Sequence, residues 1–244
     1  RLATEGNLIP VYREHLADME TPVSALQRFA DDEHVFLLES VEGGERWGRY
    51  SFIGVHPYAV FTVSEGVARL ERNGDVEELS SGGSPFESLR GVLSASRPVA
   101  VPGLPRFAGG AVGTIGYETV CEFEDLPSPK GALGGPVSAF MLTDQLIVFD
   151  NVRHTVSVVA HARPDHHDSL EAAYDDACRR VEALEARLQQ PVVDKTSTAP
   201  GDASVHMSSN MTPDRFGRMV ESAREHIVNG DIIQVVLSQR FSAD

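Results

Sequence analysis

Residues 36–53 read FLLESVEGGERWGRYSFI, which predicts two apolar strands joined by a polar loop that holds the only tryptophan of the chain. The first strand, at residues 36–38, is expected to be buried, and it is followed by the carboxylate of Glu39 and the hydroxyl of Ser40. An apolar wall with a few orienting polar groups at its mouth is typical of a small-molecule pocket. A hairpin with a solvated acidic tip explains the same pattern, so both interpretations stay open on pattern alone.

Strand-like runs and short turns dominate the chain on both sides of this stretch. Asn73-Gly74 lies between two such runs and is the strongest short signal for a β-hairpin. Further strands are expected at residues 8–13, 58–63, 67–72, 76–79, 107–117, 139–149 and 155–162. Helices with one apolar face are expected at residues 21–30, 84–95 and 168–190. We therefore predict an α+β fold with mainly antiparallel sheets and peripheral helices.

Capping residues mark the start of each expected helix. Thr21 precedes a proline and is typical of a helix N-cap. Ser84 and Glu87 have the spacing of a capping box, and Asp168 and Glu171 resemble the same motif.

Small residues cluster within 107–117, at Ala108, Gly109, Gly110, Ala111 and Gly113. Glycine inside a strand usually marks the close approach of another backbone. The run lacks the Lys-Ser/Thr of a P-loop and the spacing of a dinucleotide fingerprint, which disfavours nucleotide binding.

Histidines offer little support for a metal site. His154 and His161 lie on or beside expected strands, and no further ligand types follow at metal-binding spacing. We expect solvated or strand-surface histidines rather than a zinc or iron site.

The composition excludes several classes of protein. A net charge of −15 over 244 residues argues against nucleic acid or an anionic membrane surface as a partner. No apolar run approaches the roughly 20 residues of a membrane span. Two cysteines are too few for a disulfide framework, and a cytoplasmic protein with reduced thiols is expected.

A boundary is expected near residue 191. Residues 191–209 are polar and rich in Pro, Ser and Thr, as in a linker, and a new unit follows at 210–244. Its helix is expected to begin after Thr212, to end at Gly230 and to feed a strand at 231–241. That helix carries an apolar stripe expected to be buried, at Phe216, Met219, Val220, Ala223 and Ile227. Because so apolar a strand needs neighbours, and because the chain does not begin with Met, a fragment of a longer protein is expected.

Four blocks resemble the anthranilate synthase component I family: LLESVEGGERWGRYSFIG at 37–54, FAGGAVGTIGYETV at 107–120, FMLTDQLIVFDNVRHTVSVVAHA at 140–162, and GDIIQVVLSQRF at 230–241. The resemblance implies a subunit that converts chorismate and ammonia to anthranilate and pyruvate in tryptophan biosynthesis. It implies a glutamine amidotransferase partner, inhibition by tryptophan, and Mg²⁺ held by residues expected beyond residue 244. Residues 1–190 would form the regulatory tryptophan-binding domain and 210–244 the incomplete start of the chorismate-binding domain, a fragment expected to be inactive alone.

The resemblance also implies site residues. Leu38, Glu39 and Ser40 match the family's tryptophan-binding strand end, and Arg49 aligns with a basic residue beyond the loop. Period-two alternation favours Ser40 as the direct contact, with Glu39 supporting. Gln234 occupies a position where relatives that add water to chorismate carry a Lys base, and a polar spacer in a strand explains it equally well.

Two other interpretations remain from the sequence. Aminodeoxychorismate synthase component I, from the folate pathway, shares a Gln at position 234. A stand-alone amino-acid-sensing module without catalysis is the alternative from a different class of protein.

Overall fold

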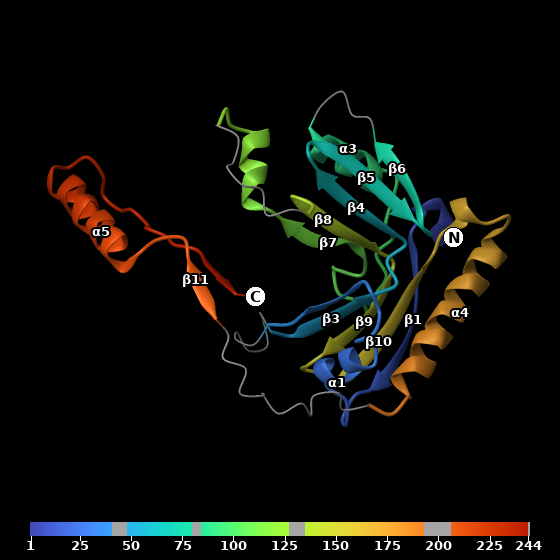
Figure 1. Ribbon diagram of the computed structural model, residues 1–244. Helices are drawn as coiled ribbons and strands as arrows, with labels where there is room; N and C mark the ends of the chain where they lie inside the picture. Colours follow the sequence, from blue (N-terminus) through green and yellow to red (C-terminus); the bar gives the residue numbers. More distant parts are fainter. Residues whose placement is uncertain (41–47, 80–83, 127–134, 193–205, 244) are drawn as a thin grey trace. The chain divides into compact units, whose positions relative to one another are not determined.

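A computed structural model describes residues 1–40, 48–79, 84–126, 135–192 and 206–243. The chain divides into two units, Arg1–Val193 and Asp194–Asp244. The first unit contains two five-stranded antiparallel sheets, as the sequence predicts (Figure 1). The α+β fold class is thereby confirmed.

The first sheet has the strand order β1-β10-β9-β3-β2. Its strands are β1 (Ile9–Leu16), β10 (Thr155–Ala162), β9 (Gln145–Asp150), β3 (Tyr50–Val55) and β2 (Val35–Leu38). The register is antiparallel throughout, with Val11 opposite Ala160 and Ile53 opposite Ile147.

The second sheet has the order β6-β5-β4-β8-β7. Its strands are β6 (Asp75–Leu79), β5 (Val67–Arg72), β4 (Ala59–Ser64), β8 (Ser138–Thr143) and β7 (Gly110–Ile115). Asn73 and Gly74 have φ of 53° and 86°. Two consecutive positive φ values are those of a type I′ turn, so the predicted hairpin is confirmed.

Two chain segments pass directly from one sheet to the other. β3 leads into β4 through residues 56–58, and β8 leads into β9 through Asp144 alone. The single strand predicted at 139–149 is therefore wrong, because the backbone changes sheets at its middle. Asp144 holds this corner: its carboxylate lies 3.2 Å from Arg180, and its carbonyl accepts a 3.0 Å bond from the His161 backbone N–H.

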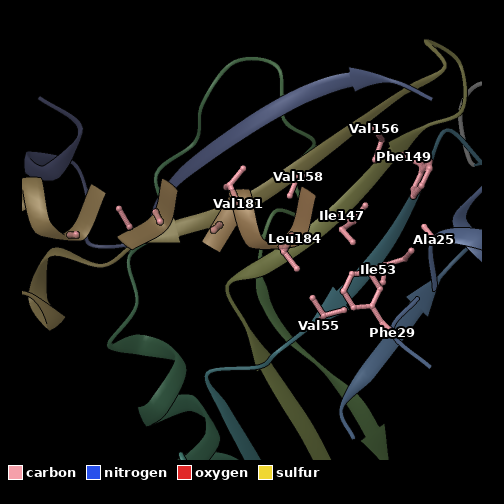
Figure 2. Close-up of a cluster of buried hydrophobic side chains, with 14 residues drawn as sticks. Ala25, Phe29, Ile53, Val55, Ile147, Phe149, Val156, Val158, Val181 and Leu184 are labelled. Carbon is pink, nitrogen blue, oxygen red and sulfur yellow. The ribbon is translucent and has the colours of Figure 1, made fainter. Parts of the chain in front are cut away.

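Helices cover one face of each sheet. α4 (Leu170–Leu188) lies along β1 and β10, and the short α1 (Pro22–Gln27) lies beside the same sheet (Figure 1). Figure 2 shows the core between them, where Phe29, Ile53, Ile147 and Val181 are fully buried. α3 (Pro85–Ser94) packs Leu89 onto the second sheet. Short 3₁₀ helices complete this unit, at Leu2–Thr4, Tyr117–Glu122 and Pro164–His166.

Two of the three N-cap residues predicted in the first unit are confirmed. Thr21 accepts a 3.1 Å bond from the backbone N–H of Ser24. Ser84 caps α3 by accepting a 3.2 Å bond from the backbone N–H of Phe86, rather than from Glu87 as a capping box would have it. The predicted cap of α4 at Asp168 is wrong. Ser169 takes that role, because its extended backbone places the hydroxyl 3.1 Å from the N–H of Ala172.

Gly113 of β7 lies where the structure leaves no room for a side chain. A Cβ on Gly113 would collide with the carbonyl oxygen of Ala139 in β8. The predicted close approach of a second backbone is confirmed at this position. β7 is shorter than the strand predicted at 107–117: it begins at Gly110 and ends at Ile115, before the 3₁₀ helix that begins at Tyr117.

The second unit contains α5 (Pro213–Val228) and a two-stranded sheet of β11 (Met207–Ser209) and β12 (Phe241–Ala243). Thr212 caps α5, and Gly230 follows its end with φ 78°, as predicted. Three expectations are wrong here. β11 lies within the predicted linker, the strand predicted at 231–241 forms only from Phe241 onward, and the apolar stripe of α5 is not buried.

The differences in the strands have one physical cause. An extended run becomes a strand only when another strand completes its hydrogen bonds. Among the described residues, only β11 does so, and it reaches no further than Phe241. The apolar side chains of this unit stay accessible: Ile227 on α5 is 45% exposed and Ile233 is 99% exposed.

Candidate functional site

The candidate site lies where β2 ends and β3 begins. The two strands pair side by side, with Leu38 opposite Phe52, so the chain from residue 39 to 49 connects neighbouring strand ends. The prediction of a buried first strand is wrong. β2 is the edge strand of its sheet, so Phe36 and Leu37 are half-buried and Leu38 is 42% exposed.

The two faces of β2 contact different apolar clusters. Leu37 packs into the core beneath α4, together with Ile53. Phe36 packs on the other face, against an aromatic cluster that contains Tyr50, Phe52 and Phe107 around buried aliphatic side chains. In that cluster the rings of Phe52 and Phe107 meet edge to face, with centroids 5.2 Å apart.

Glu39 and Ser40 follow the strand and are exposed. Because β2 ends at Leu38, the period-two rule does not decide which of the two faces the aromatic cluster. Their role as ligand contacts stays a prediction. Residues 41–47, including Arg46 and the tryptophan at 47, lie outside the described residues.

Arg49 is held by a carboxylate that the sequence interpretation did not include. Its Nε lies 3.1 Å from both oxygens of Asp150, and its Nη2 lies 2.7 Å from Oδ2. The guanidinium also lies over the ring of Tyr50, with 4.9 Å between its central carbon and the ring centroid. The planar guanidinium favours such two-point pairing with a carboxylate.

Asp150 is fixed from a second side by the turn that follows it. Its Oδ1 accepts 3.1 Å bonds from the backbone N–H groups of Val152 and Arg153. Burial alone would raise the pKa of Asp150, but the hydrogen bonds from Arg49 and the two turn amides outweigh it, so the pKa is lowered. The same pairing raises the pKa of Arg49.

Asn151 completes the attachment of the hairpin end to the β9–β10 turn. Its backbone N–H donates to the carbonyl of Arg49 at 2.8 Å, and its side-chain amide donates to the carbonyl of Gly48 at 3.1 Å. The amide also lies 3.2 Å from the hydroxyl of Ser51, which is fully buried. The Asp150-Asn151 pair at this turn therefore positions Arg49.

The ion pair with Asp150 does not use every N–H donor of the Arg49 guanidinium. The bonds to Asp150 use Nε–H and one N–H of Nη2, whereas the N–H groups of Nη1 take no part in them. A guanidinium has five N–H donors, so a second anion can bind at the Nη1 edge. The arrangement suits a rigid cation that recognises a carboxylate.

Gln234 lies in the second unit and is exposed, in a segment without regular structure. The predicted strand position of this residue is therefore wrong for the chain as described. Its catalytic role stays a prediction.

His161 differs most from prediction among the histidines. It is only 2% exposed rather than solvated, and its Nδ1 lies 3.0 Å from the backbone oxygen of Asp144. Burial lowers its pKa. The apolar run VSVVAHA around His161 could have indicated this burial, because such a run is typical of a strand covered on both faces. His154 is exposed, as expected.

Neither a metal centre nor a membrane segment is found in the described part of the chain. No group of three or more His, Cys, Asp or Glu side chains there is placed to hold a metal ion. No helix there is long and apolar enough to cross a membrane.

Comparisons with known proteins agree with one another. The family described as chorismate binding enzyme matches residues 33–244. Proteins named anthranilate synthase component 1 are 37% identical over 250 residues in Acetivibrio thermocellus and 39% identical over 257 residues in Synechocystis. These alignments cover 100% and 99% of this chain, but 50% and 49% of the relatives.

A solved structure extends the similarity to the fold. The crystal structure of anthranilate synthase component I from Streptococcus pneumoniae is similar with a TM-score of 0.60 and 26% identity. The match covers 94% of this chain and 48% of the other. The chain thus spans about half the length of the relatives that it matches.

Proposed function

Because this chain belongs to the chorismate-binding enzyme family, we propose that it is part of an anthranilate synthase component I. Such a subunit converts chorismate and ammonia to anthranilate, pyruvate and water, a lyase reaction of tryptophan biosynthesis. The observation that carries this proposal is the alignment of essentially the whole chain with proteins named anthranilate synthase component 1. A glutamine amidotransferase would supply the ammonia, and the enzyme would act in the cytoplasm.

The proposed division of labour follows the order of the chain. Residues 1–190 would bind tryptophan, 191–209 would link, and 210–244 would begin the chorismate-binding domain. Mg²⁺, a hard cation that binds carboxylates, would hold the substrate. No cluster of side chains among the described residues suits Mg²⁺. We therefore propose that the Mg²⁺ ligands lie in the region that corresponds to the uncovered half of the relatives' sequences.

The hairpin end supplies the groups that an amino-acid inhibitor needs. Ser40 would hydrogen-bond the ligand's ammonium or carboxylate, and the Nη1 edge of Arg49 would receive the carboxylate. Leu38 and the aromatic cluster beside it would face the indole, with Glu39 in support. The ion pair with Asp150 keeps the Arg49 guanidinium oriented, so little rotational freedom would be lost on binding.

Gln234 is proposed to lie near the chemistry once a neighbouring strand pairs with residues 231–241. A neutral amide cannot activate water as a base. An enzyme that uses ammonia as its nucleophile has no need of such a base, which agrees with glutamine at this position.

Product analysis tests the proposed reaction. A polypeptide of the relatives' full length that contains this chain is incubated with chorismate, ammonium and Mg²⁺, and the products are separated by chromatography. Anthranilate and pyruvate in equal amounts support the proposal. Accumulation of 4-amino-4-deoxychorismate would assign the protein to the folate pathway, and unchanged chorismate would refute both enzymes.

A further inference from the structure

A cavity borders the edge of the first sheet that lies opposite β2. A cavity of about 250 Å³ opens between the segment 98–109 and strands β1 and β10. Its walls are mainly apolar and include Leu8, Pro10, Val99, Val101, Leu104 and Ala108. None of the residues discussed above for tryptophan lines it.

The walls of this cavity are anchored at both ends. Val99 donates its backbone N–H to the carbonyl of Leu8 at 2.9 Å, and the side chain of Asn7 accepts from the backbone N–H of Arg97 at 2.6 Å. Further along the segment, the hydroxyl of Tyr12 donates to the carbonyl of Pro102 at 3.1 Å. The cavity is therefore formed in advance, which lowers the entropic cost of binding a ligand.

A buried imidazole lines this cavity. His161 is among the lining residues, and its Nδ1 must carry the proton, because the backbone oxygen of Asp144 at 3.0 Å can only accept. Burial lowers the pKa of His161, so the ring is neutral near pH 7. Nε2 is then an acceptor, and the bond to Asp144 does not use it, so it can accept a hydrogen bond from a ligand.

The mouth of the cavity carries a positive charge. Arg106 is exposed and lines the cavity, whereas no carboxylate occurs among the described residues that do so. The acidic neighbour closest to His161, Asp144, is neutralised by Arg180 at 3.2 Å. An anionic ligand is therefore favoured here although the whole chain carries −15.

We propose that this cavity binds a small aromatic carboxylate whose ring carries an N–H or O–H group. The apolar walls contact the ring, Nε2 of His161 accepts from the ring substituent, and Arg106 attracts the carboxylate. The volume agrees, since a cavity of roughly 150 Å³ can already hold benzene. The proposal does not depend on the reaction proposed above.

Calorimetric titration of the 244-residue chain tests this site with defined probes. The compounds 2-aminobenzoate and 4-hydroxybenzoate carry both groups in two spacings, benzoate carries only the carboxylate, and phenol only the donor. At least one two-group probe is expected to bind more tightly than benzoate and phenol. Absence of binding by every probe at millimolar concentration would overturn the proposal.

Four substitutions then locate the binding. Ala108→Leu fills the cavity and should abolish binding of every probe. His161→Phe should weaken the two-group probe and phenol by roughly three- to tenfold and leave benzoate unchanged. Arg106→Ala should weaken the carboxylates by about two- to fivefold and leave phenol unchanged. Arg97→Ala, an exposed arginine of the adjoining segment outside the cavity, is the matched control and should change nothing.

Circular dichroism checks that each variant is folded. Should His161→Phe fail to fold, the Arg106 and Ala108 variants decide the question. Binding that Ala108→Leu leaves unchanged would place the ligand elsewhere and refute the proposal.

Discussion

Asp150 offers the sharpest test of how the hairpin end is held. Asp150→Asn keeps the size of the side chain but removes the charge that pairs with Arg49 and accepts from two turn amides. Asp150 is only 10% exposed at its side chain, so water compensates little for the loss. Hydrogen bonds to a charged group are worth about 1.5–3 kcal/mol, and we expect the free energy of unfolding to fall by that amount at pH 7. For a unit of this size the melting temperature would drop by roughly 3–12 °C.

The pH dependence identifies the carboxylate as the cause. The pKa of Asp150 in the folded chain is below its usual value of 3.8. A carboxyl group with a lowered folded pKa stabilises fully above its unfolded pKa, and this stabilisation is lost as the pH falls through the folded pKa. The difference between wild type and Asp150→Asn should therefore be largest near neutral pH and shrink below pH 3.8.

Urea denaturation at several pH values measures this difference. Asp75→Asn, at an exposed aspartate of β6, is the matched control and should change the unfolding free energy by less than about 0.5 kcal/mol. A loss in Asp150→Asn that is equally large at pH 3 and pH 7 would refute the electrostatic explanation. An unchanged free energy of unfolding would show that the ion pair between Asp150 and Arg49 does not stabilise the fold.

Three further predictions concern the fold and its activity. Gly113→Ala should destabilise the chain by about 1–3 kcal/mol in urea unfolding, because the added Cβ would collide with the carbonyl oxygen of Ala139. The control Gly91→Ala, at a helical position with open space around it, should be neutral or stabilising. Ile147→Ala should cost about 2–5 kcal/mol in the same assay because the residue is fully buried, whereas the exposed Ile233→Ala should cost less than about 0.5 kcal/mol. The 244-residue chain alone should form no anthranilate from chorismate, ammonium and Mg²⁺, and fluorescent product from it would contradict the proposed location of the metal ligands.

Local rules predicted the elements that depend on neighbours in sequence. The Asn73-Gly74 hairpin and the caps at Thr21 and Thr212 follow from single residues with special backbone or hydrogen-bonding properties. The same rules do not show where a strand changes sheets, so the corner at Asp144 was missed. The carboxylate at this corner contacts Arg180 in α4, 36 residues away in sequence, which no sequence-local rule reports.

The candidate site shows the same division. The sequence placed Leu38, Ser40 and Arg49 near one another, and the pairing of β2 with β3 agrees with that. The partner of Arg49 lies 101 residues further along the chain, beyond any sequence-local signal. The burial of His161 likewise depends on packing between segments distant in sequence, which alternation within one strand does not report.

We propose that the end of β2 forms a regulatory tryptophan site on a chorismate-using enzyme, and inhibition of anthranilate formation by tryptophan is the decisive measurement. The assay compares wild type with Ser40→Ala in a polypeptide of the relatives' full length. Loss of a hydrogen bond to a charged ligand group should raise the half-inhibitory tryptophan concentration roughly ten- to a hundredfold. An inhibition curve that Ser40→Ala leaves in place, or a wild-type enzyme that tryptophan does not inhibit, would contradict the claim.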